Sequence, residues 1–587
     1  MSEGQLYPVI QNPAARAGQS LTGRWRAIVD PYDVGSHSIY GDAWPLGFWR
    51  EFPLRPGLGE YDFEQSALLS VPGDWNSQDP RLFFYEGCVW YKRTFEVTLE
   101  PGRRLFLHFG AANYETHVYL NAEAVGTHQG GFTPFCFEVT DRVHDGSNTL
   151  IVKVDASRRA EGVPGLQTDW WNYGGITRDV RLLELPGTFV RDYLLGLSND
   201  GSLQGWVQLD GPEATIPVRL DIEGLKVGLT LQPDADGRAE VRLDVQPRCW
   251  SPESPRLYPV TLRAGEDEVC DRIGFRRIET QGTEILLNGE PVFLRGISIH
   301  EEAPMRGGRS FGEDDARTLL GWAKELGCNF VRLAHYTHDE ATVRMADELG
   351  LLVWGEVPVY WNLSWTNEAT LANAKHQLST MLERDRNRAC FVLCSIGNEA
   401  PATPERLAFM GGLADHVRET DATRLVTCAL MARHEEDTMT IDDPMAEHLD
   451  VMGCNEYLGW YYGDVDCVAQ VRWECATSKP LILSEFGAGA LAGRHGDGSE
   501  LFSEEHQARV YEAQIAMLRQ IPFLAGLSPW ILMDFRTPRR LLPGIQDYYN
   551  RKGLVSERGQ RKRAFEVLRA WYARLAEHAS AKRQAPR

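Results

Sequence analysis

The C-terminal half of the sequence alternates short apolar runs with helical segments, and no other feature constrains the fold as much. Eight apolar runs of strand length occur after residue 279. They span residues 292–299, 329–335, 351–357, 390–396, 424–430, 450–457, 480–486 and 526–535. Most are followed by a segment of helical periodicity, such as 314–327 and 504–520. Strands and helices that alternate in this way predict a (β/α)8 TIM barrel over residues 279–587.

The N-terminal half has the pattern of β-structure throughout. In residues 1–186, alternating apolar and polar positions between turn residues predict a jelly-roll β-sandwich. Its clearest strands lie at 104–109, 116–121, 135–140 and 148–155. The next segment also lacks helical periodicity, and its length of about 90 residues suits one immunoglobulin-like β-sandwich. We therefore predict three domains, over residues 1–186, 187–278 and 279–587.

The charge balance limits the partners of the protein. The chain has 61 Lys and Arg residues against 82 Asp and Glu, a net charge of −21. Nucleic acids and anionic membrane surfaces bind basic faces, so we expect neither as a partner. No apolar run approaches the roughly 18 residues of a membrane-spanning helix, and the first residues lack the pattern of a signal peptide. Because the eleven cysteines form no CxxC pair, we expect reduced thiols and a cytoplasmic protein.

Two glutamates stand at the ends of predicted barrel strands. Glu399 follows the fourth strand, and Glu485 lies at the end of the seventh. The C-terminal ends of barrel strands open at one mouth, so these side chains can face one another there. Paired carboxylates suit glycoside cleavage, in which one protonates the leaving oxygen and the other stabilises positive charge at the anomeric carbon. A single glutamate would more simply be a surface residue or an ion-pair partner, but two at one mouth favour a catalytic pair.

Several motifs occur in an order that is typical of one enzyme family. They are G-F-R at 274–276, F-L-R-G at 293–296, R-L-A-H-Y at 332–336, G-N-E at 397–399, S-E-F-G at 484–487 and D-W-W-N-Y-G-G-I-T-R at 169–178. With a jelly roll, an immunoglobulin-like domain and a barrel, this set resembles glycoside hydrolase family 2, the β-galactosidase and β-glucuronidase family. The resemblance covers almost the whole chain.

The resemblance implies a retaining, two-step exo-hydrolysis of a β-linked carbohydrate. Glu399 would act as general acid and then base, and Glu485 as the nucleophile that carries the glycosyl-enzyme ester. Retention requires the two carboxyl groups to lie about 5–5.5 Å apart. By analogy with the family we also expect a homo-oligomer.

Further substrate contacts follow from the same resemblance. Asn398 matches the residue that bonds the sugar 2-hydroxyl, Tyr457 the tyrosine beside the nucleophile, and Tyr461 a substrate contact of the glucuronidases. His335 would bond sugar hydroxyls, with a packed strand histidine as the alternative, and His300 ends the first strand in a similar way. Trp530 would form an aromatic floor, with core packing as its alternative. The sequence contains neither an HExxH motif nor a close Asp, Glu and His cluster, so we expect no metal and no cofactor.

The identity of the sugar depends on a short basic stretch near the C-terminus. Asn550 and Lys552 have the N-x-K spacing with which β-glucuronidases hold the C6 carboxylate, and Asp169 matches an aspartate of the same pocket. Well-known glucuronidases also carry an arginine where this chain has Gln546, and Arg539 or Arg540 is a candidate substitute. A solvated turn is the alternative interpretation of Arg551 and Lys552.

We therefore favour hydrolysis of a β-glucuronide or a β-galacturonide, which differ only at C4. The first alternative is a β-galactosidase of the same family. The second, from a different class, is a catalytically silent carbohydrate-binding protein, against which the intact pair of Glu399 and Glu485 argues.

Overall fold

A computed structural model describes residues 6–37, 43, 47–49, 61–198 and 200–584. The chain divides into two compact units. One contains residues 1–159, 172–248 and 257–275, and the other contains 160–171, 249–256 and 276–587. Two short segments from the N-terminal half thus belong to the same unit as the barrel. The boundaries at 186/187 and 278/279 stay predictions.

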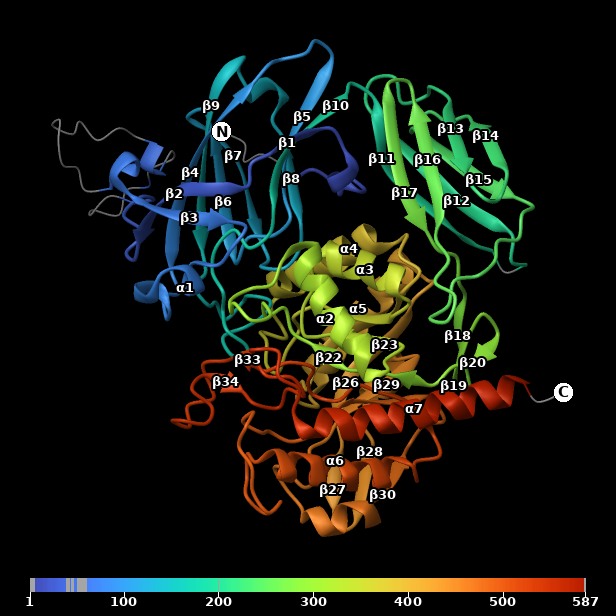
Figure 1. The fold of residues 1–587 in the computed structure, drawn as a ribbon. Helices are drawn as coiled ribbons and strands as arrows, with labels where there is room; N and C mark the ends of the chain where they lie inside the picture. The colour runs from blue at the N-terminus through green and yellow to red at the C-terminus, as the bar shows by residue number, and fades with distance from the viewer. Residues whose placement is uncertain (1–5, 38–42, 44–46, 50–60, 199, 585–587) are drawn as a thin grey trace. The chain divides into compact units, whose positions relative to one another are not determined.

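The first unit begins with a β-sandwich, as predicted (Figure 1). A six-stranded sheet has the order β3-β2-β4-β9-β6-β7, and a four-stranded sheet has the order β1-β10-β5-β8. Their bounds are β1 Gly18–Ser20, β2 Gly23–Asp30, β3 Ala67–Val71, β4 Cys88–Val97, β5 Arg103–Phe109, β6 Glu115–Leu120, β7 Glu123–Gln129, β8 Phe135–Glu138, β9 Gly146–Asp155 and β10 Val180–Pro186, with the short helix α1 at Trp75–Gln78. Apolar side chains that alternate along these strands, such as Leu105, Leu107 and Phe109, form the core.

A second sandwich in this unit has the immunoglobulin-like arrangement. Its sheets have the orders β11-β12-β15 and β14-β13-β16-β17. The strands are β11 Phe189–Leu197, β12 Leu203–Asp210, β13 Val218–Ile222, β14 Val227–Leu231, β15 Arg238–Leu243, β16 Tyr258–Ala264 and β17 Asp267–Ile273. Val218, Leu220 and Ile222 alternate along β13 and enter the shared core, while Arg219 between them is exposed. Strict alternation of this kind made the segment recognisable in the sequence.

The second unit contains a closed parallel barrel. Its sheet has the order β21-β32-β31-β29-β26-β25-β24-β23-β22. The strands are β21 Leu294–Arg295, β22 Ser298–Ile299, β23 Phe330–Leu333, β24 Leu352–Glu356, β25 Phe391–Asn398, β26 Leu425–Met431, β29 Val451–Asn455, β31 Leu481–Glu485 and β32 Leu524–Leu527. The first predicted strand is split into β21 and β22 at Gly296. A Cβ there would lie 2.3 Å from Phe330 and 2.5 Å from the Leu527 carbonyl oxygen, so only glycine fits this closing contact.

Helices connect most barrel strands. They are α2 Gly312–Leu326, α3 Glu340–Leu349, α4 Glu368–Asp385, α5 Pro404–Thr420, α6 Glu504–Leu518 and α7 Arg563–Gln584. The connections after β26 and β29 contain 3₁₀ turns at Pro444–His448 and Val465–Gln470, and a small sheet of β27 Arg433–Glu435, β28 Thr438–Ile441 and β30 Arg472–Cys475. A three-stranded antiparallel sheet precedes the barrel, with β18 Ile278–Gln281, β19 Glu284–Leu287 and β20 Glu290–Pro291.

The eighth strand is shorter than its predicted range of 526–535. β32 ends at Leu527, and Trp530 lies three positions beyond it instead of ending it. Pro529 has no N–H to continue a ladder. The chain after Trp530 bonds instead to residues 552–555, for example from the Asp534 N–H to the Val555 carbonyl across 2.9 Å. A two-stranded ribbon of β33 Phe535–Arg536 and β34 Tyr549–Asn550 follows.

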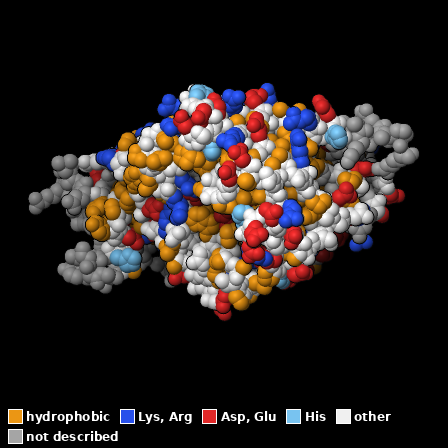
Figure 2. Space-filling view, turned by 90° about the horizontal axis from the view of Figure 1, so that it is seen from below, with side chains coloured by type: hydrophobic (Ala, Val, Ile, Leu, Met, Phe, Trp, Pro, Cys, Tyr) orange, Lys and Arg blue, Asp and Glu red, His pale blue; other side chains and the backbone are white. Residues whose placement is uncertain are grey.

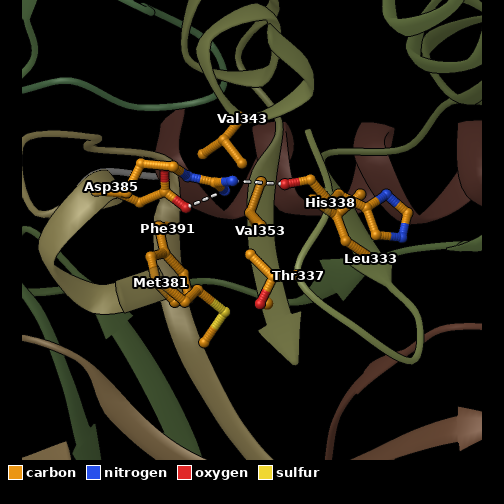
Figure 3. A pocket seen from close by; sticks show the side chains of 10 residues that line it. Leu333, Thr337, His338, Val343, Val353, Met381, Asp385 and Phe391 are labelled. Atoms are coloured by element: carbon orange, nitrogen blue, oxygen red, sulfur yellow. Dashed lines mark hydrogen bonds and ion pairs between the residues drawn. The ribbon is translucent and has the colours of Figure 1, made fainter. Parts of the chain in front are cut away.

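A small cavity lies between the barrel sheet and helices α3 and α4 (Figure 3). Leu333, Val353 and Phe391 line it from the strands, and Val343 and Met381 line it from the helices. It is therefore a gap between the two layers and not part of the barrel mouth.

The surface in Figure 2 mixes acidic, basic and apolar side chains. On that face, the described residues form no continuous basic area. None of the helices in the described part of the chain is long and apolar enough to cross a membrane.

Candidate active site

A buried arginine on β23 joins the ends of several barrel strands. Arg332 is fully buried, and its Nη1 donates to Glu485 Oε1 across 2.9 Å. Its Nη2 donates to Asn398 Oδ1 across 2.7 Å, and its Nε donates to Glu356 Oε1 across 2.5 Å. One rigid guanidinium therefore orients the carboxylate at the seventh strand end and the amide at the fourth. In the sequence, Arg332 was noted only as the first residue of the R-L-A-H-Y motif. A charged residue in a strand that is otherwise apolar does, however, indicate that it needs buried partners.

Glu485 is the last residue of β31 and is 4% exposed. Its Oε2 accepts a hydrogen bond from the Tyr457 hydroxyl across 2.6 Å, so Tyr457 lies directly beside Glu485. Burial, followed by the charge of Glu399, raises the pKa of Glu485 to about 8, while Arg332 and Tyr457 act to lower it. The two glutamates therefore lie close enough for the charge of Glu399 to act on Glu485.

Glu399 directly follows the last residue of β25 and is partly exposed. Its Oε2 accepts from the Trp361 Nε1–H across 2.8 Å, and its Oε1 accepts from Asn455 Nδ2 across 3.0 Å. Glu399 and Trp361 both have positive φ, 49° and 53°, in the left-handed region that side chains other than glycine rarely occupy. Such strain persists where surrounding contacts hold it. Neither Trp361 nor Asn455 was named as a site residue from the sequence.

Asn455 connects the surroundings of both glutamates. It ends β29 beside β31, where it pairs in register with Glu485. Its side-chain Oδ1 accepts from Ser484 Oγ across 2.7 Å, while its Nδ2 reaches Glu399. The structure therefore brings Glu399 and Glu485 to one rim of the barrel, although they are 86 positions apart in the sequence.

Aromatic and imidazole rings gather beside the glutamates. His335 stacks on Trp530 with centroids 4.7 Å apart, and its Nδ1 lies 3.2 Å from Glu356 Oε2. His300 meets the edge of Trp530 at 5.1 Å, and Trp170 lies 5.7 Å from His335. Burial lowers the pKa of both histidines well below the ordinary value, so both imidazoles are neutral near pH 7. His335 and Trp530 thus lie against one another beside the buried glutamate Glu356 and Trp170, which was not named as a site residue from the sequence.

The predicted carboxylate clamp lies next to the same tyrosines. Lys552 Nζ is 2.5 Å from the Tyr461 hydroxyl and lies over the rings of Tyr457 and Tyr461, 4.7 and 4.4 Å from their centroids. The Lys552 N–H donates to Asn550 Oδ1 across 3.2 Å, which fixes the turn between the two residues. Because Tyr457 also bonds Glu485, the clamp and the glutamate pair are parts of one site.

Asp169 orients a second cation in the clamp. It belongs to segment 160–171, which packs in the unit of the barrel. Its carboxylate accepts from Thr537 Oγ1 and from Arg540 Nη2, each across 2.8 Å. Asn550 Nδ2 lies 3.4 Å from the same carboxylate. Arg540 and Asn550 therefore both contact the Asp169 carboxylate. The guanidinium of Arg539 instead lies over the ring of Trp361, 4.8 Å from its centroid.

Arg551 and Lys552 are not part of a solvated turn. Both are buried, and Arg551 Nη1 pairs with Asp534 Oδ2 at 3.2 Å and Glu557 Oε2 at 2.7 Å. Arg551 therefore anchors the turn through these two carboxylates. Gln546 accepts from the Leu542 N–H across 3.3 Å.

No group of three or more His, Cys, Asp or Glu residues among those that the structure describes is placed to hold a metal ion.

Comparison with known proteins agrees with this architecture. Two β-sandwiches and a barrel with paired carboxylates at its mouth define a glycoside hydrolase. The family descriptions matched are the sugar binding domain of glycosyl hydrolases family 2 over residues 19–186, glycosyl hydrolases family 2 over 198–276, and its TIM barrel domain over 278–575. The chain belongs to glycosyl hydrolases family 2.

Individual relatives place the chain near one branch of that family. It is 28% identical to the β-glucuronidase of Paenibacillus borealis, with 98% of this chain and 99% of the relative covered. The structure of a β-glucuronidase from an uncultured Clostridium species aligns with a TM-score of 0.82 at 26% identity, covering 97% and 100% of the two chains. That of Bifidobacterium dentium β-glucuronidase, complexed with coumarin-3-O-glucuronide, aligns with a TM-score of 0.83 at 25% identity, covering 96% and 98%. This chain is thus a β-glucuronidase-like protein that acts on carbohydrate glycosides.

Proposed function

We propose that this protein is a retaining, exo-acting β-glycosidase that removes terminal β-linked uronic acids, as a β-glucuronidase or a β-galacturonidase. The observation that carries the proposal is the charge of the clamp. It contains two cations, Arg540 and Lys552, and one carboxylate, Asp169, which is already paired with Arg540. One positive charge is left over beside the sugar site.

The surplus charge suits the C6 carboxylate of a uronic acid. A carboxylate would accept charged hydrogen bonds from Lys552 and Arg540, which are stronger than those to neutral acceptors. Arg540 Nε is buried and has no hydrogen-bond partner among the described residues. A neutral hydroxymethyl group offers a single uncharged acceptor oxygen, which would compensate the desolvation of the two cations less well than a carboxylate.

The glutamate pair supports double displacement. Glu399 would protonate the glycosidic oxygen while Glu485 attacks the anomeric carbon, which releases the aglycone and forms a glycosyl ester on Glu485. Glu399, now ionised, would take a proton from water as that water attacks the ester, which frees Glu485 and the uronic acid with retained configuration. The two donors on Glu485 favour its ionised form.

Asn398 has a free donor for the sugar. Its Oδ1 accepts from Arg332, while its buried Nδ2 has no partner among the described residues. This supports its predicted bond to the 2-hydroxyl, which strengthens in the transition state.

A panel of p-nitrophenyl β-glycosides tests the proposal: glucuronide, galacturonide, galactoside and glucoside. We expect kcat/KM to be at least about a hundredfold higher for one of the two uronides than for galactoside, since each charged hydrogen bond contributes about 1.5–3 kcal/mol. Proton NMR should show the β-anomer as the first sugar product. A preference for galactoside would support the β-galactosidase alternative, and an initial α-anomer would contradict retention.

A further inference from the structure

A fully buried lysine outside the clamp joins three parts of the site. Lys562 Nζ donates to the Ala490 carbonyl across 2.6 Å, to Asp534 Oδ1 across 2.7 Å and to the Arg551 carbonyl across 3.0 Å. Lys562 is 1% exposed. An ammonium has three N–H donors, so all of its capacity is used inside the protein.

Each of the three acceptors belongs to a segment that carries a site residue. Ala490 lies on the segment that leaves β31 after Glu485. Asp534 follows Trp530, and Arg551 stands between Asn550 and Lys552. Lys562 therefore connects the chain after the proposed nucleophile to the turn that holds the proposed carboxylate clamp.

Asp534 completes this connection from the other side. Its Oδ1 also accepts from the Gly553 N–H across 2.9 Å, and its Oδ2 accepts from Arg551 Nη1 across 3.2 Å. The approach is so close that a Cβ on Gly553 would lie 2.2 Å from the Asp534 nitrogen. Gln507 adds a parallel bridge, since its Nε2 donates to the Ala488 carbonyl across 2.8 Å and to the Gly553 carbonyl across 3.3 Å.

We propose that Lys562 is a positioning residue that sets the place of the Asn550–Lys552 turn relative to Glu485. This inference rests on the proposed function. The distance from C1 to C6 of a sugar ring is nearly fixed, so C1 meets Glu485 in line only if the clamp holds the carboxylate at the matching distance. A displacement of about 1 Å at such a site is enough to cost on the order of a hundredfold in rate.

The substitution Lys562→Met tests this, because it keeps the length of the side chain and removes its three donors. Turnover of p-nitrophenyl β-glucuronide and β-glucoside is compared, or of the galacturonide and galactoside if the wild type prefers galacturonide. We expect kcat/KM for the uronide to fall at least about tenfold more than for the neutral sugar, which does not use the clamp.

Lys479→Met is the matched control. Lys479 Nζ also donates to three main-chain carbonyls, those of Ala446, Glu447 and Leu449, before the first residues of β29 and β31 and therefore at the strand ends opposite to Glu485. It should lower the thermal midpoint and leave the ratio of uronide to neutral activity within about threefold, because its partners carry no site residue. Should Lys562→Met not fold, Gln507→Leu, which removes the parallel bridge, is measured with the same readout and a smaller fall in the ratio is expected.

An unchanged ratio in a folded Lys562→Met, or in Gln507→Leu where it replaces that variant, overturns the inference. Failure of the proposed function is seen separately, as a wild-type enzyme without preference for either uronide.

Discussion

Trp361 donates its indole N–H to Glu399 across 2.8 Å, and both residues hold a left-handed backbone conformation. Trp361 donates to Oε2 of Glu399, the glutamate proposed as the acid, and Asn455 donates to its Oε1. The direction of the Glu399 carboxyl is therefore determined on both sides. Strain of about 1–3 kcal/mol for each such residue is the cost of this arrangement.

Replacing Trp361 by Phe removes the donor and keeps an aromatic ring. We expect kcat/KM to fall about tenfold on methyl β-glucuronide, since a hydrogen bond to a charged group contributes about 1.5–3 kcal/mol, and to fall less on p-nitrophenyl β-glucuronide. The poorer the leaving group, the more it depends on a well-placed acid. Trp365→Phe is the control, because its indole donates to Asn362 and not to a glutamate. Equal losses of kcat/KM on both substrates would mean that Trp361 does not contribute to protonation of the leaving group.

Substitution of Glu485 by Ala should abolish turnover, because no carboxylate remains to form the glycosyl ester. Circular dichroism and the binding of glucuronic acid or galacturonic acid, measured by calorimetry, check that the fold and the sugar site persist. Hydrolysis at the wild-type rate would remove the proposed mechanism. Binding of the sugar by the wild type with no turnover of any glycoside would favour the non-catalytic alternative.

Lys552→Met and Arg540→Met should each lower kcat/KM on uronides by about tenfold or more, given about 1.5–3 kcal/mol for a charged hydrogen bond. Activity on galactoside should change little. Arg539→Met is the neighbouring control, because Arg539 lies over Trp361 and does not pair with Asp169. If galactoside and uronide activities fall equally, these cations do not recognise the carboxylate.

Glu456 should make stability depend on pH. Its side chain is buried, and burial raises the pKa of its carboxyl to about 8 from the ordinary 4.5, while the Leu458 N–H opposes the rise. The folded state therefore keeps the proton up to about pH 8, whereas the unfolded chain loses it near pH 4.5. The resulting stabilisation is complete below pH 4.5 and is lost as pH rises through 8.

The variant Glu456→Gln is neutral at every pH and tests this directly. We expect the stability of the wild type, measured by urea unfolding and compared with that of the variant, to decline from pH 5 to pH 8. The contributions of other titrating groups to stability are the same in both proteins and cancel in this difference, as long as these groups do not couple to Glu456. A difference that is constant over this range would contradict the raised pKa.

The sequence by itself determined the architecture, because periodicity is a local property. Strand-length apolar runs and helical segments located the barrel, and alternation located β13 and the sandwiches. The ends of β25 and β31 placed Glu399 and Glu485 at one rim. The same local view extended the eighth strand past Pro529 and left a solvated turn open as the alternative for Arg551 and Lys552, since the partners of Arg551, Asp534 and Glu557, cannot be recognised from the turn alone.

Only the tertiary structure decided how the site is assembled. Arg540 reaches Asp169 from 371 positions away, and Arg332 joins Glu485 from 153 positions away. An arginine in a sequence has many possible partners, and the free energy of burying it depends on which carboxylate is buried next to it. That choice is made by packing, so Arg540, Trp361 and Lys562 acquire their roles only in the folded chain.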